Sequence, residues 1–295
     1  MPTFLQPNGH AEERPARAAL VVSHPGHELR VHGWLETALP LVCVLTDGSG
    51  RTQRSRLDST TRVLEAAGAA AGDVYGAMTD AELYAAVLDF EHERFTRVVD
   101  DLAAMMLRER VNCVAGDAAE GYNPAHDICR LLVNAAVRLV RRTTPQSRIA
   151  NYDFTLIAPP RRCPEALSAD AVWLRLDEAA LARKLTAARN YPELQAEVEA
   201  ALSGAGSVGL REHPDLAARA GADFAGPGAN DFSVECLRPV DARRDSTTPF
   251  DGPRPFYEEY GERQVLAGHY ERVLRYGEHV LPLAAALDAH VERNS

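Results

Sequence analysis

The sequence is poor in lysine and in long apolar runs. Lys184 is the only lysine, so Schiff-base and phosphate-loop chemistry have one candidate residue, which stands in a polar helical stretch. The formal net charge of -10 argues against a nucleic-acid partner, because binding a phosphate backbone requires clustered Lys and Arg. No segment approaches the ~20 apolar residues that a membrane span needs.

Paired cysteines are also missing. The chain has five cysteines, an odd number without a Cys-x-x-Cys pair, which is typical of reduced thiols. The first residues carry prolines and mixed charges instead of an apolar signal segment. We therefore expect a cytoplasmic protein without a membrane partner. The cysteines are Cys43, Cys113, Cys129, Cys163 and Cys236.

Short apolar runs that end in turn residues are present. Ala18–Ser23, Leu41–Thr46 and Val111–Ala115 have the continuous apolar character of buried parallel strands. The stretches between and after them have helical periodicity. This order predicts an α/β fold, a Rossmann-like, mostly parallel sheet with helices on both faces. Predicted helices are Thr52–Ala67, Phe90–Arg110 and one from Asn123 or Pro124 to Val140; later strands are Asp153–Ala158 and Ala171–Leu176.

Composition divides the chain into four segments. Residues 1–17 are an N-terminal tail, and residues 18–202 are the α/β core, which ends in the helical stretch 177–202. Residues 203–255 are rich in Gly, Pro, Asp and Ala, which predicts a long excursion or lid. Residues 256–295 are an amphipathic helical region that packs on the core.

Polar residues follow three of the predicted strands. His24 and His27 follow the first in S-H-P-G-H-E, Asp47 follows the second in T-D-G-S-G-R, and His126 follows the third in G-Y-N-P-A-H-D. Because ligands bind outside the carboxyl ends of parallel strands, these residues should converge. Three imidazoles suit zinc, with ferrous iron as the alternative. A single His after a strand more often caps or hydrogen-bonds, and the other histidines are interpreted in that way.

These three motifs resemble those of the LmbE-like or PIG-L family of zinc-dependent N-deacetylases. That family typically has His-Pro-Asp-Asp-Glu, Thr-x-Gly and His-Pro-Asp-His at the corresponding places. The resemblance covers about the first half of the chain and implies an LmbE-like fold and removal of acyl groups from amino sugars or related small amides. The metal ligands that it implies fall on His24, His27 and His126.

The departures from the family motifs fall on the acid and base groups. The family's general base falls on Gly26, its oxyanion-stabilising His on Asn123, and the supporting Asp on Ala125. Glu28, Asp47, Asp117 and Asp127 are alternative carboxylates. Glu28, Asp47 and Asp127 also have structural interpretations, as a cap, a turn residue and an orienting group. The predicted catalytic set is Asp127, Asp47 and Asn123, with Asn123 donating to an oxyanion.

Substrate contacts can be expected from two other regions. Arg51 and Arg54, with Arg56 after them, follow the second strand and would hold an anionic substrate, unless they form a solvated helix face. The tyrosines after residue 256 would line an aromatic wall over a sugar, unless they pack in the core.

The predicted function is a metal-dependent hydrolase with an N-acyl sugar or sugar conjugate as small-molecule substrate. Because the base position is Gly26, a metal-dependent lyase or hydratase, or a non-catalytic binding protein on the same fold, stays open as the alternative. The oligomeric state also stays open.

Overall fold

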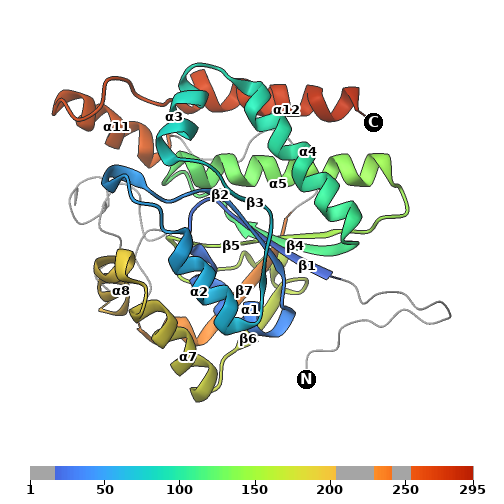
Figure 1. Cartoon of the computed structure of the whole chain (residues 1–295), viewed down its shortest axis with the longest axis vertical. Coiled ribbons are helices and arrows are strands. Elements are labelled where there is room, and N and C mark those ends of the chain that lie inside the picture. The colour runs from blue at the N-terminus through green and yellow to red at the C-terminus, as the bar shows by residue number, and fades with distance from the viewer. Residues whose placement is uncertain (1–16, 204–228, 241–253, 295) are drawn as a thin grey trace.

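The computed structural model describes residues 17–203, 229–240 and 254–294. In these residues seven strands form a sheet of order β3-β2-β1-β4-β5-β7-β6 (Figure 1). Strands β1 to β5 pair in parallel, whereas β7 is antiparallel to both β5 and β6. The strands are β1 (Arg17–Val22), β2 (Leu41–Thr46), β3 (Ala70–Met78), β4 (Val111–Asp117), β5 (Ala150–Phe154), β6 (Val172–Arg175) and β7 (Val234–Pro239).

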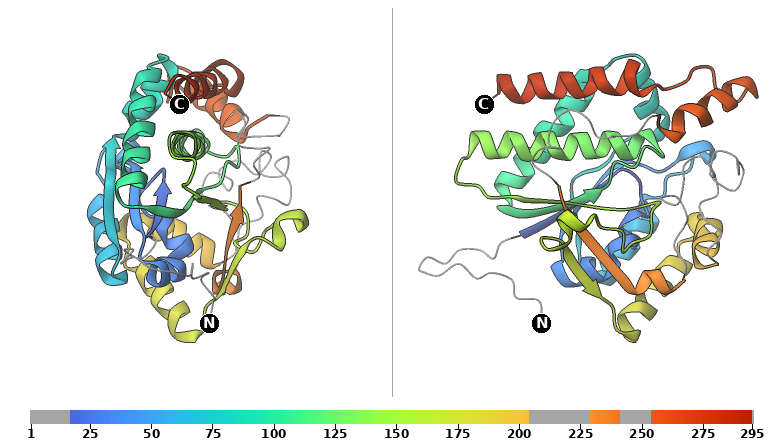
Figure 2. Two further views of the ribbon diagram at one scale, coloured as in Figure 1. Left: turned by 90° about the vertical axis from the view of Figure 1, so that its right-hand side faces the viewer. Right: turned by 180° about the vertical axis from the view of Figure 1, so that it is seen from behind.

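Helices cover both faces of this sheet, as predicted (Figure 2). They are α1 (His32–Ala38), α2 (Leu57–Ala67), α3 (Asp80–Leu88), α4 (His92–Arg108), α5 (Pro124–Thr143), α6 (Glu165–Ser168), α7 (Glu178–Arg189), α8 (Gln195–Leu202), α11 (Phe256–Leu266) and α12 (Leu281–Arg293). Short turns of 3-10 or π-helix are η1 (His27–Val31), η2 (Gly50–Thr52), η3 (Pro192–Leu194), η5 (Ala229–Ser233) and η6 (Tyr276–Val280).

Alternation along β1 shows how the sheet separates two apolar cores. Ala19 and Val21 belong to the cluster that α4, α5 and α12 complete, whereas Leu20 and Val22 belong to the cluster on the α1 and α2 side. Successive side chains of a strand point to opposite faces, so a strand buried on both faces needs a continuous apolar sequence. The run A-A-L-V-V therefore suits an interior strand, and β1 lies between β2 and β4.

Two predicted elements have different bounds in the structure. The strand expected at Asp153–Ala158 is β5, and it ends at Phe154 because the Glu120 carboxylate binds the next N–H groups, those of residues 156 to 158, at 2.7–3.0 Å. The helix expected from Thr52 begins at Leu57, because Gln53 adopts a left-handed conformation with φ of 55° and interrupts it.

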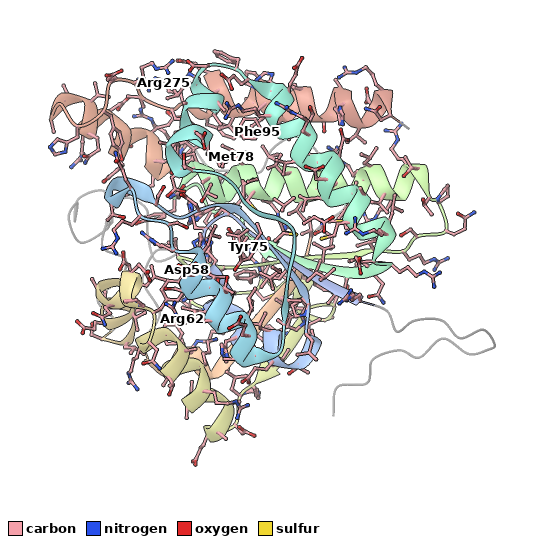
Figure 3. All side chains as sticks on the ribbon, viewed as in Figure 1. Asp58, Arg62, Tyr75, Met78, Phe95 and Arg275 are labelled. Carbon is pink, nitrogen blue, oxygen red and sulfur yellow. The ribbon has the colours of Figure 1, made fainter. Side chains whose placement is uncertain are left out.

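β3 was not predicted from the sequence. Its segment A-A-G-D-V-Y-G-A-M contains two glycines and mostly exposed or half-buried residues, as an edge strand has. On this edge the Tyr75 hydroxyl lies 2.9 Å from Thr61 Oγ1 of α2. Asp58 and Arg62 of the same helix lie near Tyr75 in the view of Figure 3. The contact between Tyr75 and Thr61 fixes α2 to the edge of the sheet.

The segment 203–255 differs from the predicted excursion in its described part. Val234–Pro239 forms β7, which inserts between β5 and β6. Glu235 of β7 is buried and accepts from Lys184 Nζ at 2.7 Å and from the N–H groups of Gly33 and Trp34 at 2.8 Å. This paired carboxylate ties β7 to α1 and α7. Residues 204–228 and 241–253, like residues 1–16 of the predicted tail, lie outside the described part of the chain.

In the described residues, no helix combines the length and the apolar character needed to cross a membrane.

Candidate functional site

The candidate site lies where the sheet order reverses. From β1 the chain proceeds to β2 and β3 on one side, then returns to β4 on the other side of β1. The loops after β1 and β4 therefore border a common crevice, which is the usual ligand position in open parallel sheets. His24 and His27 follow β1, and Asp117 and His126 follow β4.

The three predicted histidines come together there. Their ring centroids are 5.3 Å apart for His24 and His27, 5.4 Å for His24 and His126, and 4.7 Å for His27 and His126. His126 is 5% exposed, whereas the side chains of His24 and His27 are 13% and 18% exposed. We call His24, His27 and His126 the histidine cluster.

Carboxylates lie close to Nδ1 of two of these rings. Asp117 Oδ2 lies 2.9 Å from His27 Nδ1, and Asp80 Oδ1 lies 3.1 Å from His24 Nδ1, which also contacts Thr46 Oγ1 at 2.8 Å. The Asp117 carboxylate accepts, so Nδ1 of His27 carries the proton. The Thr46 hydroxyl donates to the Ser23 carbonyl at 3.0 Å and therefore accepts from His24 Nδ1, so Nε2 of both rings carries the lone pair. This is the tautomer of a metal-ligating His whose other nitrogen is held by an outer carboxylate.

The electrostatics of the cluster favour neutral rings. Burial lowers the pKa of His126 well below its usual value, with the two neighbouring histidines adding to the effect. Burial also lowers the pKa of His27, although Asp117 opposes it. Burial would raise the pKa of Asp117, but His27, His126 and the Ser23 hydroxyl bring it below its ordinary range. Neutral imidazole is the form that binds a metal ion.

The donor set was compared with what zinc requires. An imidazole nitrogen lies about 2 Å from bound zinc, so the centroids of three tetrahedrally arranged rings should be about 5 Å apart, as they are here. His126 Nδ1 is buried without a hydrogen-bond partner. As the side chains stand, however, no group of three His, Cys, Asp or Glu in the described ranges is arranged to hold a metal ion. The residue types and the ring spacing are those that zinc requires.

Gly26 stands in a closed space. Its φ is 103°, a conformation that side-chain-bearing residues rarely adopt, and a Cβ there would lie 2.3 Å from Leu194 Cδ1. Its N–H donates to Glu28 Oε2 at 2.7 Å, so Glu28 holds the turn, in agreement with its capping interpretation. A side chain at Gly26 would therefore need a strained backbone and a shift of the end of the Leu194 side chain.

The predicted catalytic residues occupy three different settings. Asn123 Oδ1 accepts from Ala125 N at 2.8 Å and from the Tyr84 hydroxyl at 3.1 Å, which caps α5 and leaves Nδ2 to donate elsewhere. Asp47 Oδ1 accepts from Ser49 N at 3.0 Å in a tight turn. Asp127 Oδ1 accepts from the N–H groups of Glu120 and Gly121, both at 3.1 Å.

The arginines after β2 are not equivalent. The side chain of Arg51 lies outside the described part of the structure, and Arg54 is exposed. Arg56 is half-buried, and its charge contributes to the lowered pKa of His27, after burial and the neighbouring His24. Among the described side chains, the charge of Arg56 thus acts on His27.

Asp80 was missed by sequence reasoning. It follows the unpredicted strand β3 and begins α3, where Thr79 and Glu82 form a reciprocal capping box. Asp80 Oδ2 accepts from Gly50 N at 2.6 Å, so the same carboxylate joins the η2 loop to His24. The Thr-x-x-Glu pattern of the capping box was the signal that could have located this helix start.

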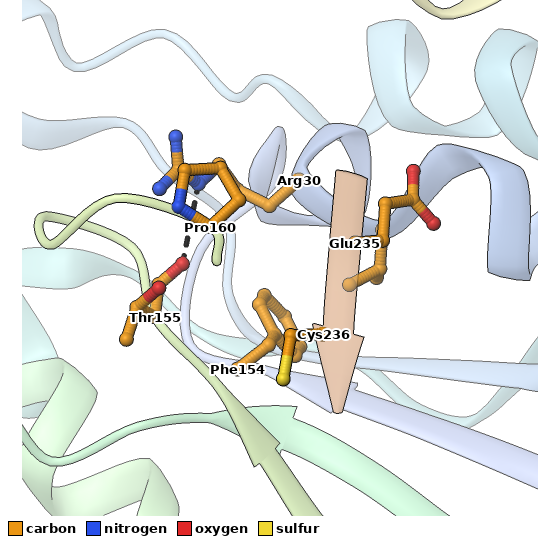
Figure 4. Close-up of a pocket in the computed structure, with 7 residues that line it drawn as sticks. Arg30, Phe154, Thr155, Pro160, Glu235 and Cys236 are labelled. Atoms are coloured by element: carbon orange, nitrogen blue, oxygen red, sulfur yellow. Dashed lines mark hydrogen bonds between the residues drawn. The ribbon is translucent and has the colours of Figure 1, made fainter. Parts of the chain in front are cut away.

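A small pocket lies apart from the three histidines, none of which lines it (Figure 4). Arg30 lines it, donating from Nε to the Thr155 carbonyl at 3.2 Å and from a terminal nitrogen to the Ala158 carbonyl at 2.9 Å. Because Glu235 on its wall is also fully paired, this pocket is a structural junction.

Comparisons with known proteins give limited similarity. No family model matches the sequence, and the search of curated proteins finds no match. Solved structures that are similar include a deacetylase of the A40926 pseudoaglycone, with a TM-score of 0.46 and 17% identity over 77% of this chain and 97% of that chain. A zinc-inhibited form of a teicoplanin deacetylase has a TM-score of 0.45 and 12% identity over 77% of this chain and 100% of that chain.

Proposed function

We propose that this chain is a metal-dependent hydrolase that removes an acyl group from an amino sugar or a related small amide. The observation that carries the proposal is the histidine cluster, in which carboxylates hold Nδ1 of two rings. The motif resemblance of the post-strand loops supports the reaction class. Zinc is the proposed metal, and ferrous iron is the alternative. A cytoplasmic location belongs to the same proposal.

The residues of the chain have distinct proposed roles. His24, His27 and His126 would hold the ion, which when bound supplies a positive charge that polarises an amide carbonyl and acidifies water. Asp80 and Asp117 orient two of the rings through Nδ1. Asn123 Nδ2 would donate to the carbonyl oxygen, since Oδ1 is already engaged as an acceptor.

Separate residues are proposed for proton transfer and for binding the charge of the substrate. Asp127 and Asp47 remain the predicted proton-transfer groups, and both carboxylates already accept backbone N–H groups. Arg51 and Arg54 remain the predicted contacts for an anionic substrate, and the half-buried Arg56 is the better placed neighbour of His27.

The test is metal content together with acetate release. Protein purified without a metal-affinity tag should contain about one zinc or iron per chain by elemental mass spectrometry, and should release acetate from N-acetylglucosamine derivatives. His126→Ala and His24→Ala should lose the metal and reduce acetate release by at least about 100-fold.

His279→Ala is the matched control. His279 stacks on Phe90, with ring centroids 5.5 Å apart, and is not part of the cluster, so this variant should keep both the metal and the activity. The proposal of a metalloenzyme would be refuted if the protein contained no metal after reconstitution, or if both cluster variants retained the metal. Ligand binding without any turnover would favour the non-catalytic alternative, and an unsaturated product would favour a lyase.

A further inference from the structure

Two cysteines that lie far apart in the sequence meet beside β7. Cys163 stands in the loop between β5 and α6, whereas Cys236 lies within β7. The two thiols are within hydrogen-bonding reach of each other, and both are free. The odd number of cysteines and the lack of a Cys-x-x-Cys pair gave no sign of this contact. We call Cys163 and Cys236 the thiol pair.

Strand pairing places Cys236 on the face of β7 that α6 covers. Cys236 pairs with Trp173 of β6, so both side chains project from the same face of the two strands. Leu237, the next residue, belongs to the apolar core on the other face. The Trp173 indole donates to the Ser168 carbonyl at the end of α6 at 3.2 Å. α6, which begins two residues after Cys163, therefore lies over the face that carries Cys236.

The loop that carries Cys163 is joined to the same region by two further contacts. Pro160 and Cys236 both line the small pocket of Figure 4. A terminal nitrogen of Arg161 lies 2.7 Å from Asp231 Oδ1 in η5, directly before β7. The packing of these segments thus holds the two thiols together, and rotation about the side-chain bonds would bring the sulfurs to the ~2 Å of a disulfide bond.

The two thiols differ in access to solvent. Cys236 is 3% exposed, whereas Cys163 is half-buried. The Cys163 thiol donates to the Pro164 carbonyl at 3.6 Å, so its sulfur is left to accept from Cys236. Burial, with Cys163 as a further cause, raises the pKa of Cys236 to about 12. Because the thiolate is the nucleophile in thiol–disulfide exchange, Cys163 is the thiol that an external oxidant meets first.

We propose that the thiol pair is a redox modification site, which a small disulfide of the glutathione type oxidises to an intramolecular disulfide. The Cys163 thiolate attacks one sulfur of the oxidant and releases a thiolate, which takes up a proton. Cys236 then loses its proton and attacks the Cys163 sulfur of the mixed disulfide, which releases the second thiol. Two protein thiols are oxidised, and one glutathione disulfide is reduced to two molecules of glutathione.

Thiol counting and peptide mapping test the thiol pair. The folded full chain is incubated with glutathione disulfide, quenched with acid, and alkylated in denaturant. The untreated protein should show all five thiols and the oxidised protein should lose two of them. Mass spectrometry of a non-reduced tryptic digest should find one peptide joined at Cys163 to another joined at Cys236. Dithiothreitol should restore all five thiols.

Serine variants separate the two steps of the oxidation. Cys236→Ser should stop at the mixed disulfide of Cys163 with glutathione. Cys163→Ser should consume glutathione disulfide at least about tenfold more slowly, because the remaining thiol of the pair is buried. Cys113→Ser is the matched control, because Cys113 is half-buried like Cys163, and this variant should keep the cross-link. Cys236→Ala serves if Cys236→Ser does not fold.

Three results would overturn the inference. They are the retention of all five thiols after oxidation, a cross-link to a different cysteine, and a cross-link that forms only in denaturant. The proposed hydrolase does not use either cysteine, so the two proposals fail separately. A cross-link between Cys163 and Cys236 in a protein that releases no acetate would uphold the thiol pair and refute the hydrolase. Acetate release by a protein that forms no cross-link would do the reverse.

Discussion

Asp117 and Asp127 are both 0% exposed, yet their surroundings shift their pKa values in opposite directions. Asp117, at the end of β4, has imidazole neighbours and the Ser23 hydroxyl, which overcome burial and lower its pKa. Asp127, in the first turn of α5, has no cation among its partners, so burial raises its pKa to about 7 despite two backbone N–H donors.

The difference shows that burial alone does not identify a functional carboxylate. The charge on Asp117 is stabilised by the histidine cluster, which it orients in return through His27. Asp127 and Glu120 accept backbone N–H groups of loops, and Glu235 accepts those of the first turn of α1. Asp117 thus contacts the histidine cluster, and the hydrogen bonds of Asp127 join the first turn of α5 to the loop before it.

The largest expected effect comes from removing the Asp117 carboxylate. Asp117→Ala leaves Ser23 N, the Ser23 hydroxyl and His27 Nδ1 without their acceptor at 2.6–2.9 Å. We expect metal affinity to fall by about 10- to 100-fold and the free energy of unfolding to fall by about 3 kcal/mol. Metal titration and urea unfolding measure the two losses.

Asp117→Asn separates these two losses, because the amide oxygen can still accept from Ser23. This variant should recover most of the stability and little of the metal affinity. Full metal affinity in Asp117→Asn would show that the charge of Asp117 does not orient His27.

An intermediate effect is expected at Gly26, the position of the missing base. Gly26→Asp combines a strained φ of 103° with a Cβ only 2.3 Å from Leu194 Cδ1, so it should lower the free energy of unfolding by about 2 kcal/mol and not increase activity. Gly26→Asp with Leu194→Ala removes the contact and retains the backbone strain. If Gly26→Asp alone folded with full stability and raised activity, the space would not be closed.

The smallest effect is expected for Asp127→Asn. At pH 5 this variant should change the free energy of unfolding by less than about 1 kcal/mol, because a neutral amide replaces a protonated acid. The folded-state pKa of about 7 is above the ordinary 3.8, so between these values the unfolded chain has released a proton that the folded chain keeps. Stability of the wild type should therefore fall as pH rises through this window. Urea unfolding of both proteins from pH 4 to pH 8 measures the difference. If the stability of the wild type and of Asp127→Asn depended on pH in the same way, Asp127 would be ionised in the folded wild type over the whole range measured.

Sequence reasoning succeeded where one physical demand dominated. β2 was predicted with its observed bounds because a strand buried on both faces must be continuously apolar. The histidine cluster was predicted because the loops after parallel strands converge. Edge strand β3, with its glycines, and β7, within a Gly/Pro-rich segment, gave no such signal.

The partners of the cluster were harder to predict than its members. Asp80 was missed because it follows β3, so an unrecognised strand concealed a post-strand residue. Asp117 contacts His27, whereas Asp127 accepts from the N–H groups of the loop before α5. Motif spacing does not determine which of the two carboxylates has the histidine partner.

The burial of Lys184 has a practical consequence for the handling of the protein. The only lysine of the chain is 2% exposed and its ammonium donates to Glu235 and to the Arg30 carbonyl. In the folded state no lysine amine is available to amine-directed cross-linkers, dyes or coupling resins. Modification of Lys184 by such a reagent would therefore report opening of the junction between α7 and β7, and the rate of labelling would be a direct assay of how often that junction opens.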